Sequence, residues 1–432
     1  MYNKFETNFA KTNTVTLNKT KYTKNYWVSE NSESLREKRD KAKLKYLNSK
    51  LASDQKIWKD LRDQTNNSFK NDKIKQYENL CKEVTEAAKQ NDIKRIYKTI
   101  NIISGKIRKN YTTLVKKMDG TDPINNDDCI NEWKNYFDKL LNNQNTNQIH
   151  EAAVIEPAET DLPISTEDFT IDEVKTAIKS LKNGKSPGID LITSEALKFC
   201  GDKGITALKD ICNNVLNTGV SPKQWNTSII IPVPKKGNRT EMNNYRGIAL
   251  MSIAAKTFNR MILNRIYEPI NQILRPNQAG FRRGLSCAHP INTLKRIMQG
   301  ANTKQLPLIT IFVDLKKAFD SIDRQKMWQI LRSYGVPLKI VNAIKSIYQN
   351  SECKIKIGNQ YSQNFYVKTG VLQGDTLSPF LFNIVIDYVF KNIPKEYGFI
   401  TEQEPLTRIN DLCFADDSVL FDDHRFVLVK TK

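Results

Sequence analysis

The sequence has few of the residues that build thiolate metal sites, disulfide frameworks or membrane spans. Its 432 residues include only three histidines, which lie far apart, and seven cysteines, no two of which form a CxxC pair. A zinc site or a disulfide framework is therefore not expected. The longest apolar stretch, Pro379–Phe390, is interrupted by Asn383 and Asp387 and is too short to cross a bilayer. The N-terminus lacks the apolar run of a signal peptide. We expect an intracellular protein, nuclear or cytoplasmic, with no membrane partner.

Acidic residues are scarce in the first quarter of the chain. The net charge is +20, and residues 1–120 contain 28 Lys and Arg against 14 Asp and Glu. A basic arm beside a nearly balanced remainder indicates attraction to nucleic acid phosphates, because cationic side chains release condensed counterions. A solvated, lysine-rich helical face has the same charge, so this pattern alone leaves the partner open.

Glycine and proline are missing from residues 34–103, which favours long helices. The chain is expected to have four regions: a disordered N-terminus over 1–30, a helical basic arm over 31–141, a linker over 142–165, and a main domain over 166–432.

The main domain shows signals for both helices and strands. Thr170 and Glu173 form a capping-box pattern, and helical apolar spacing follows up to Gly184. The β-branched run at 309–313 predicts a strand, and Gly358-Asn359 predicts a hairpin turn. Helical apolar spacing also covers residues 327–334 and 340–348. Because these elements mix without a βαβ repeat, we expect an α+β fold.

Three aspartates follow or interrupt apolar runs. Asp314 ends the strand that begins at Ile309, and Asp416-Asp417 lies between two apolar runs, as at the tip of a hairpin. Phosphoryl transfer needs two Mg²⁺ ions roughly 3.5–4 Å apart. Carboxylates from separate strands can hold them without histidine. Alone, however, an Asp-Asp pair is more often a solvated turn.

Seven sequence blocks, which include Asp416-Asp417, follow one another in an order that makes a functional role for this pair more credible. They are Gly184-Lys-Ser-Pro-Gly-Ile-Asp190, Ile231-Pro-Val-Pro-Lys235-Lys236-Gly237, Asn244-Tyr-Arg246-Gly-Ile248, Gln278-Ala-Gly-Phe281-Arg282-Arg283-Gly284, Phe312-Val-Asp314-Leu-Lys-Lys-Ala-Phe319-Asp320, Gly370-Val-Leu-Gln373-Gly374-Asp-Thr-Leu-Ser-Pro379 and Phe414-Ala-Asp416-Asp417. Over residues 170–421 this series resembles the reverse transcriptases of non-long-terminal-repeat (LINE-type) retrotransposons. The resemblance implies right-hand polymerase fingers and palm, an RNA template, a DNA primer and deoxynucleoside triphosphates. It does not indicate an oligomeric state.

The resemblance also implies roles for single residues. Asp314, Asp416 and Asp417 would be the catalytic ligands of two Mg²⁺ ions, with Mn²⁺ as an alternative. The residues implied to contact the incoming nucleotide are Lys235, Arg246, Phe319 as a sugar gate, Gln373 and Gly374. Those implied to line the template path are Gln278, Phe281, Arg282 and Arg283. Without the family, Phe319 would be read as a core aromatic, and the basic residues as solvated surface charge.

Only 15 residues follow Asp417, too few for the helical thumb that the family places there. We therefore expect a fragment with the thumb missing and with weak or no activity, because a poorly held primer reacts slowly. One alternative is a non-catalytic nucleic-acid-binding remnant. Another is an RNA-dependent RNA polymerase, against which Phe319 argues.

Overall fold

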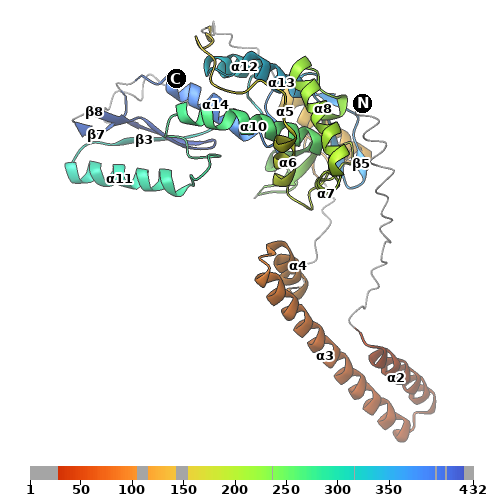
Figure 1. Ribbon diagram of the computed structural model, residues 1–432. Helices are drawn as coiled ribbons and strands as arrows, with labels where there is room; N and C mark the ends of the chain where they lie inside the picture. The colour runs from red at the N-terminus through yellow and green to blue at the C-terminus, as the bar shows by residue number, and fades with distance from the viewer. Residues whose placement is uncertain are drawn as a thin grey trace. The chain divides into compact units, whose positions relative to one another are not determined.

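The computed structural model describes residues 28–104, 115–142, 154–235, 237–315, 317–394, 397–403 and 406–422. The chain forms two compact units: one spans Val15–Tyr111, and the other contains Thr112–Lys432 (Figure 1). Residues 1–27 of the N-terminal segment expected to be disordered lie outside the described residues, as do residues 143–153 of the expected linker. No helix in the described part of the chain is long and apolar enough to cross a membrane.

The described residues of the first unit, 28–104, are mostly helical, which confirms the prediction of long helices over 34–103. Its helices are α2 (Glu30–Ser49), α3 (Ala52–Lys89) and α4 (Ile93–Ile103). Polar contacts join α2 to α3: the Ser32 hydroxyl donates to Asp72 at 2.6 Å, and the Thr65 hydroxyl lies 3.2 Å from the Leu35 carbonyl. Leu44 and Leu47 remain 62% and 54% exposed. This unit therefore buries little apolar surface of its own.

The helix α5 (Asn126–Asn142) belongs to the second unit, which differs from the expected boundary at residue 141. Trp133, Phe137 and Leu141 are buried on one of its faces. They share a core cluster with residues of a sheet more than 80 positions away, such as Ile230 and Ile355. Local composition does not reveal such a distant partner.

A five-stranded sheet lies at one end of the second unit. Its strands run in the order β2-β1-β4-β5, and β6 also pairs with β4. They are β1 (Thr227–Pro234), β2 (Tyr245–Leu250), β4 (Glu352–Ile357), β5 (Gln360–Tyr361) and β6 (Phe365–Tyr366). β1 pairs antiparallel with β2 and parallel with β4. The predicted hairpin is confirmed, because Ile357 pairs with Gln360 across Gly358-Asn359.

Helices form the main core of this unit. They are α6 (Ile171–Ser180), α7 (Ser194–Lys198), α8 (Gly201–Thr218), α9 (Lys223–Asn226), α10 (Ile253–Ile273), α12 (Arg324–Ser333), α13 (Leu338–Tyr348) and α14 (Ser378–Lys391). The 3-10 turn η1 (Met242–Asn244) instead contributes Met242 to the core cluster beside the five-stranded sheet. The Thr170–Glu173 capping box is present at the start of α6, which ends at Ser180 rather than Gly184. Helices and mixed sheets together confirm an α+β domain.

A second sheet has the strand order β3-β10-β9. It is formed by β3 (Ile309–Asp314), β9 (Asp411–Phe414) and β10 (Asp417–Asp422), and it lies beside α11 (Ala288–Lys304) and the hairpin of β7 (Phe399–Gln403) and β8 (Leu406–Ile409) (Figure 1). Ile297 of α11 packs in one small core with Leu412 and Val419. This second sheet and the turn between β9 and β10 contain all three aspartates singled out above.

Candidate active site

The three aspartates converge at one end of the second sheet. Asp314 is the last residue of β3 and lies directly opposite Asp417, the first residue of β10, while Ala415 and Asp416 form the turn between β9 and β10. Residues directly opposite in an antiparallel pair have Cβ atoms about 4.5–5.5 Å apart on one face. Segments about 100 residues apart in the chain thus supply neighbouring carboxylates.

These carboxylates have no competing partner. Asp314 and Asp417 are exposed and Asp416 is half-buried, and none of the three side-chain carboxylates makes a hydrogen bond or ion pair with another described residue. Like charges directly opposite each other repel, and a cation would offset that repulsion. The donor set suits Mg²⁺, which prefers carboxylate oxygens and water. In the present side-chain arrangement, however, no three His, Cys, Asp or Glu side chains of the described residues are grouped closely enough to hold a metal ion.

Gln278 holds the turn before Asp416. Its Oε1 accepts hydrogen bonds from the backbone N–H groups of Ala415 at 2.9 Å and Gly280 at 2.7 Å, and its Nε2 donates to the Ala415 carbonyl at 3.1 Å. Ala415 has φ +58°, a conformation that non-glycine residues seldom adopt. One buried amide therefore satisfies both backbone groups of the strained residue that precedes Asp416.

The backbone around Gln278 also fits closely against this turn. A Cβ atom on Gly280 would lie 2.2 Å from the Ala415 nitrogen, so only glycine permits the approach. From α14, the Asn383 side chain donates to the Gly280 carbonyl at 2.7 Å. The turn is thus fixed through Gly280 to the helical core.

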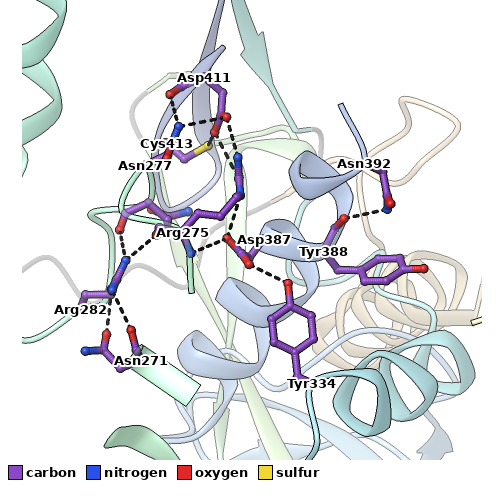
Figure 2. Close-up of polar contacts among 11 residues, drawn as sticks. Asn271, Arg275, Asn277, Arg282, Tyr334, Asp387, Tyr388, Asn392, Asp411 and Cys413 are labelled. Atoms are coloured by element: carbon purple, nitrogen blue, oxygen red, sulfur yellow. Dashed lines mark hydrogen bonds and ion pairs between the residues drawn. The ribbon is translucent and has the colours of Figure 1, made fainter. Parts of the chain in front are cut away.

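A buried ionic network lies behind the same hairpin (Figure 2). Arg275 forms ion pairs with Asp387 of α14 at 3.0 Å and Asp411 of β9 at 2.7 Å, and Tyr334 donates to Asp387 at 2.6 Å. Asp387 and Asp411 have side chains 1% and 0% exposed. Burial alone would lower the pKa of Arg275, but its hydrogen bonds and charge interactions with the two aspartates outweigh burial and raise it. The network joins β9 to the helical core.

Comparison with known proteins agrees with this geometry. Residues 233–430 match the family model described as reverse transcriptase (RNA-dependent DNA polymerase). The chain carries a reverse transcriptase domain of the non-LTR retrotransposon type.

Three relatives show how far the similarity extends. A Pol polyprotein of the type-1 retrotransposable element R2 from Nasonia vitripennis is 31% identical over 218 residues, which are 50% of this chain and 21% of the relative. The probable RNA-directed DNA polymerase from transposon BS of Drosophila melanogaster is 31% identical over 53% of this chain and 25% of its own length. The RNA-directed DNA polymerase from mobile element jockey of the same species is 25% identical over 64% of this chain and 29% of its own length. The chain therefore spans under a third of the length of each of these relatives.

Two of the four residues expected along the template path are used inside the reverse transcriptase domain. Gln278 is 2% exposed, and its amide is taken up by the turn at Ala415. Arg282 donates to the side chain of Asn271 and to the carbonyl of Arg275. The side-chain polar groups of these two residues are thus engaged in hydrogen bonds within the domain.

The other two expected template residues are accessible. Phe281 is 49% exposed, and Arg283 is exposed with its guanidinium carbon 4.3 Å from the ring centre of Tyr267. They stay available to a nucleic acid partner.

The residues expected at the nucleotide come from two parts of the domain. Phe319 stacks on Phe382, with ring centres 4.6 Å apart, and meets Phe281 edge-on at 5.9 Å. Lys235, just after β1, and Arg246, in β2, are exposed. Phe319 is therefore both half-buried in aromatic packing and close to an exposed residue.

The loop at Gln373-Gly374 touches both parts. The Gln373 amide donates to Asp320 at 3.0 Å, and its carbonyl accepts from the Ala249 N–H at 2.8 Å. Gly374 has φ +119°, and a Cβ there would lie 2.7 Å from the Ala249 carbonyl oxygen. Burial raises the pKa of Asp320, although the hydrogen bond from Gln373 and the charges of Lys317 and Lys235 oppose this. This loop thus links β2 to the segment that follows Asp314.

Sequence reasoning missed several residues that support the site: Arg275, Asp320, Asp387 and Asp411. One signal was present for Asp387, a charged residue inside the apolar stretch Pro379–Phe390. A carboxylate in such a helix is retained only when it has a buried partner.

Proposed function

We propose that this domain is an RNA-directed DNA polymerase that joins deoxynucleotides to a primer 3′-hydroxyl on an RNA template. Asp314, Asp416 and Asp417 would hold two Mg²⁺ ions. The observation that carries the proposal is the strand register that places Asp314 opposite Asp417. When bound, the ions would activate the attacking oxygen and neutralise the leaving pyrophosphate.

The protein's own part in the reaction is to bind and align. Lys235 and Arg246 are exposed cations, and a planar guanidinium suits bidentate contact with phosphate oxygens. Gln373 and Gly374 would lie against the nascent base pair, where the lack of a Cβ at Gly374 already permits close packing on Ala249. Arg283 and Phe281 remain candidates for template contact.

Phe319 is proposed to select the sugar of the incoming nucleotide. Its ring is held by stacking on Phe382, so it cannot move aside freely. A fixed aromatic face five residues after Asp314 would clash with a ribose 2′-hydroxyl and accept a deoxyribose. The selectivity would therefore depend on the stack as well as on the ring itself.

The second candidate function is nucleic acid binding without polymerisation. It is favoured by the absence of a ready three-residue metal group among the described side chains, combined with exposed cations such as Lys235 and Arg246. Both functions require an anionic partner, so a binding assay alone does not separate them.

Primer extension on an RNA template separates the two functions. The chain should extend a DNA primer with Mg²⁺ and deoxynucleotides, and Asp416→Ala should abolish extension while it still binds primer-template. The matched control is Asp172→Ala, an exposed carboxylate on α6, which should extend normally. Equal product from wild type and Asp416→Ala would refute the catalytic proposal and leave the binding function.

A further inference from the structure

An open cavity of about 1320 Å³ lies in the second unit, between α5, α12, the end of α13 and the segment around β6. It exceeds the roughly 300–1,000 Å³ of most small-ligand sites. Asp320 lines it, and the same carboxylate accepts the hydrogen bond from Gln373. The cavity therefore borders the residues proposed to contact the nucleotide, although none of the motif residues assigned to the template lines it.

A buried cation without an anionic partner lies in the cavity wall. Arg324 is 7% exposed, and its guanidinium donates to three carbonyls and one hydroxyl, those of Gly370, Tyr348, Val367 and Ser351. No described carboxylate pairs with it, and its buried Nη2 has no hydrogen-bond partner. A buried charge is normally compensated by a counter-charge. Arg324 therefore makes the cavity wall favourable for an anion.

Four lysines surround the same cavity: Lys139, Lys317, Lys345 and Lys368. All are exposed, and none forms an ion pair with a described residue. The acidic residues of the lining are Asp320 and Asp323. Asp323 caps α12 by accepting from the Lys326 N–H, and burial raises the pKa of Asp320. The cavity therefore has a clear excess of positive charge.

Aromatic side chains lie between these cations. Tyr136, Trp328 and Tyr366 all line the cavity, and Tyr366 is 60% exposed. Of these rings only that of Tyr366 is exposed, since Tyr136 is half-buried and Trp328 is buried. An exposed ring beside lysines is a feature by which proteins hold single-stranded nucleic acid, because a base stacks on the ring and phosphates meet the charges.

We propose that this cavity binds the unpaired part of the RNA template ahead of the primer end. The inference rests on the proposed polymerase function, which supplies the substrate. In a primer-template, the strand beyond the primer is the single-stranded part, and its next base must lie beside the incoming nucleotide. The link from Asp320 to Gln373 places the cavity at that position.

Binding of fluorescent primer-templates by the full chain tests this proposal without chemistry. One substrate is a blunt RNA–DNA duplex, and the other has an unpaired 5′ template extension. The extension should tighten binding, and the double variant Lys345→Glu/Lys368→Glu should lose that gain, about tenfold or more. The slope of log affinity against log salt should fall by about 1–2, and blunt-duplex binding should stay within about twofold.

A second variant tests whether a template base stacks on an aromatic ring of the cavity. Tyr366→Ala should weaken binding of the extended substrate by roughly fivefold or more, because one stacked base is lost. Tyr361→Ala, a 43% exposed tyrosine outside the cavity lining, should leave it unchanged.

The charge control is Lys326→Glu/Lys179→Glu, which reverses two exposed lysines outside the lining. Equal losses from the two double variants, equal losses on blunt and extended substrates, or no gain from the extension in wild type would each overturn the cavity proposal. None of these results bears on the polymerase proposal, which is tested separately by primer extension with Asp416→Ala.

Discussion

The hairpin with Asp416 and Asp417 and the basic cavity around Arg324 are built in opposite ways. Behind the hairpin, the polar side chains of Gln278, Asp387 and Asp411 are at most 2% exposed and fully engaged. Around the cavity, the lysines are exposed and have no described ion-pair partner. Metal ligands must be placed to a fraction of an ångström, whereas phosphate attraction tolerates displacement. Buried hydrogen bonds and ion pairs fix the position of the hairpin, whereas exposed lysines supply the positive charge of the cavity.

The largest effect should come from the carboxylates themselves. Asp417→Asn keeps the shape of the side chain and removes its charge, so primer extension should fall by about 10³-fold or more, as when an electrostatic contact to the transition state is lost. Single-turnover extension measures this rate. Asp210→Asn, on the exposed surface of α8, should extend normally. A comparable rate for Asp417→Asn would mean that this hairpin does not need its charge.

Removal of Arg275 should be the most damaging change to stability. Arg275→Leu leaves Asp387 and Asp411 buried without a cation, and the free energy of unfolding should fall by about 3–5 kcal/mol. Urea unfolding measures the change. Lys175→Leu, which breaks an exposed pair with Asp202, should cost under about 1 kcal/mol. Equal losses of unfolding free energy in the two variants would show that the buried network stabilises the fold no more than an exposed ion pair does.

Substitution of Gln278 should lower the rate of primer extension more than it lowers the stability of the fold. Gln278→Leu leaves the Ala415 N–H and carbonyl unsatisfied, and the displaced turn should lower kcat by about 100-fold with little change in the KM for deoxynucleotide. Gln363→Leu, an exposed position, is the control. If the variant lost stability while its folded fraction kept full kcat, Gln278 would be only a structural residue.

The smallest effect should be on sugar selection. Phe319→Ala opens space beside Phe382, and ribonucleotide incorporation relative to deoxynucleotide should rise by about tenfold, the scale of steric discrimination in an apolar pocket. Competition between the two nucleotides on one template gives the ratio. Phe199→Ala removes an aromatic ring that is 87% exposed and lies outside both that stack and the cavity lining, so it should leave the ratio unchanged. Unaltered selectivity in Phe319→Ala would remove its proposed role.

Local signals in the sequence were sufficient for individual elements. The Thr170–Glu173 capping box, the strand that ends at Asp314 and the turn at Gly358-Asn359 each depend on neighbouring residues, and the structure contains all three. The apolar runs around Asp416-Asp417 likewise predicted the hairpin that β9 and β10 form. Hairpin registers follow from short-range pattern and turn chemistry.

Partners far apart in the sequence were not predictable in this way. The motif suggested a template contact for Gln278, but its amide meets Ala415, 137 residues away. The position of α5 in the second unit and the pairing of Arg275 with Asp411 also depend on tertiary packing. A single sequence shows that a polar residue is present but not which buried group satisfies it.

The most direct test of the central claim is to count bound metal. Mn²⁺, observed by electron paramagnetic resonance, should bind at two sites when primer-template and a non-hydrolysable deoxynucleotide are present. Asp314→Asn should weaken this binding by at least about tenfold, while Asp172→Asn leaves it unchanged. If Asp314→Asn binds Mn²⁺ as wild type does, the carboxylates on β3 and β10 do not share cations and the account is wrong.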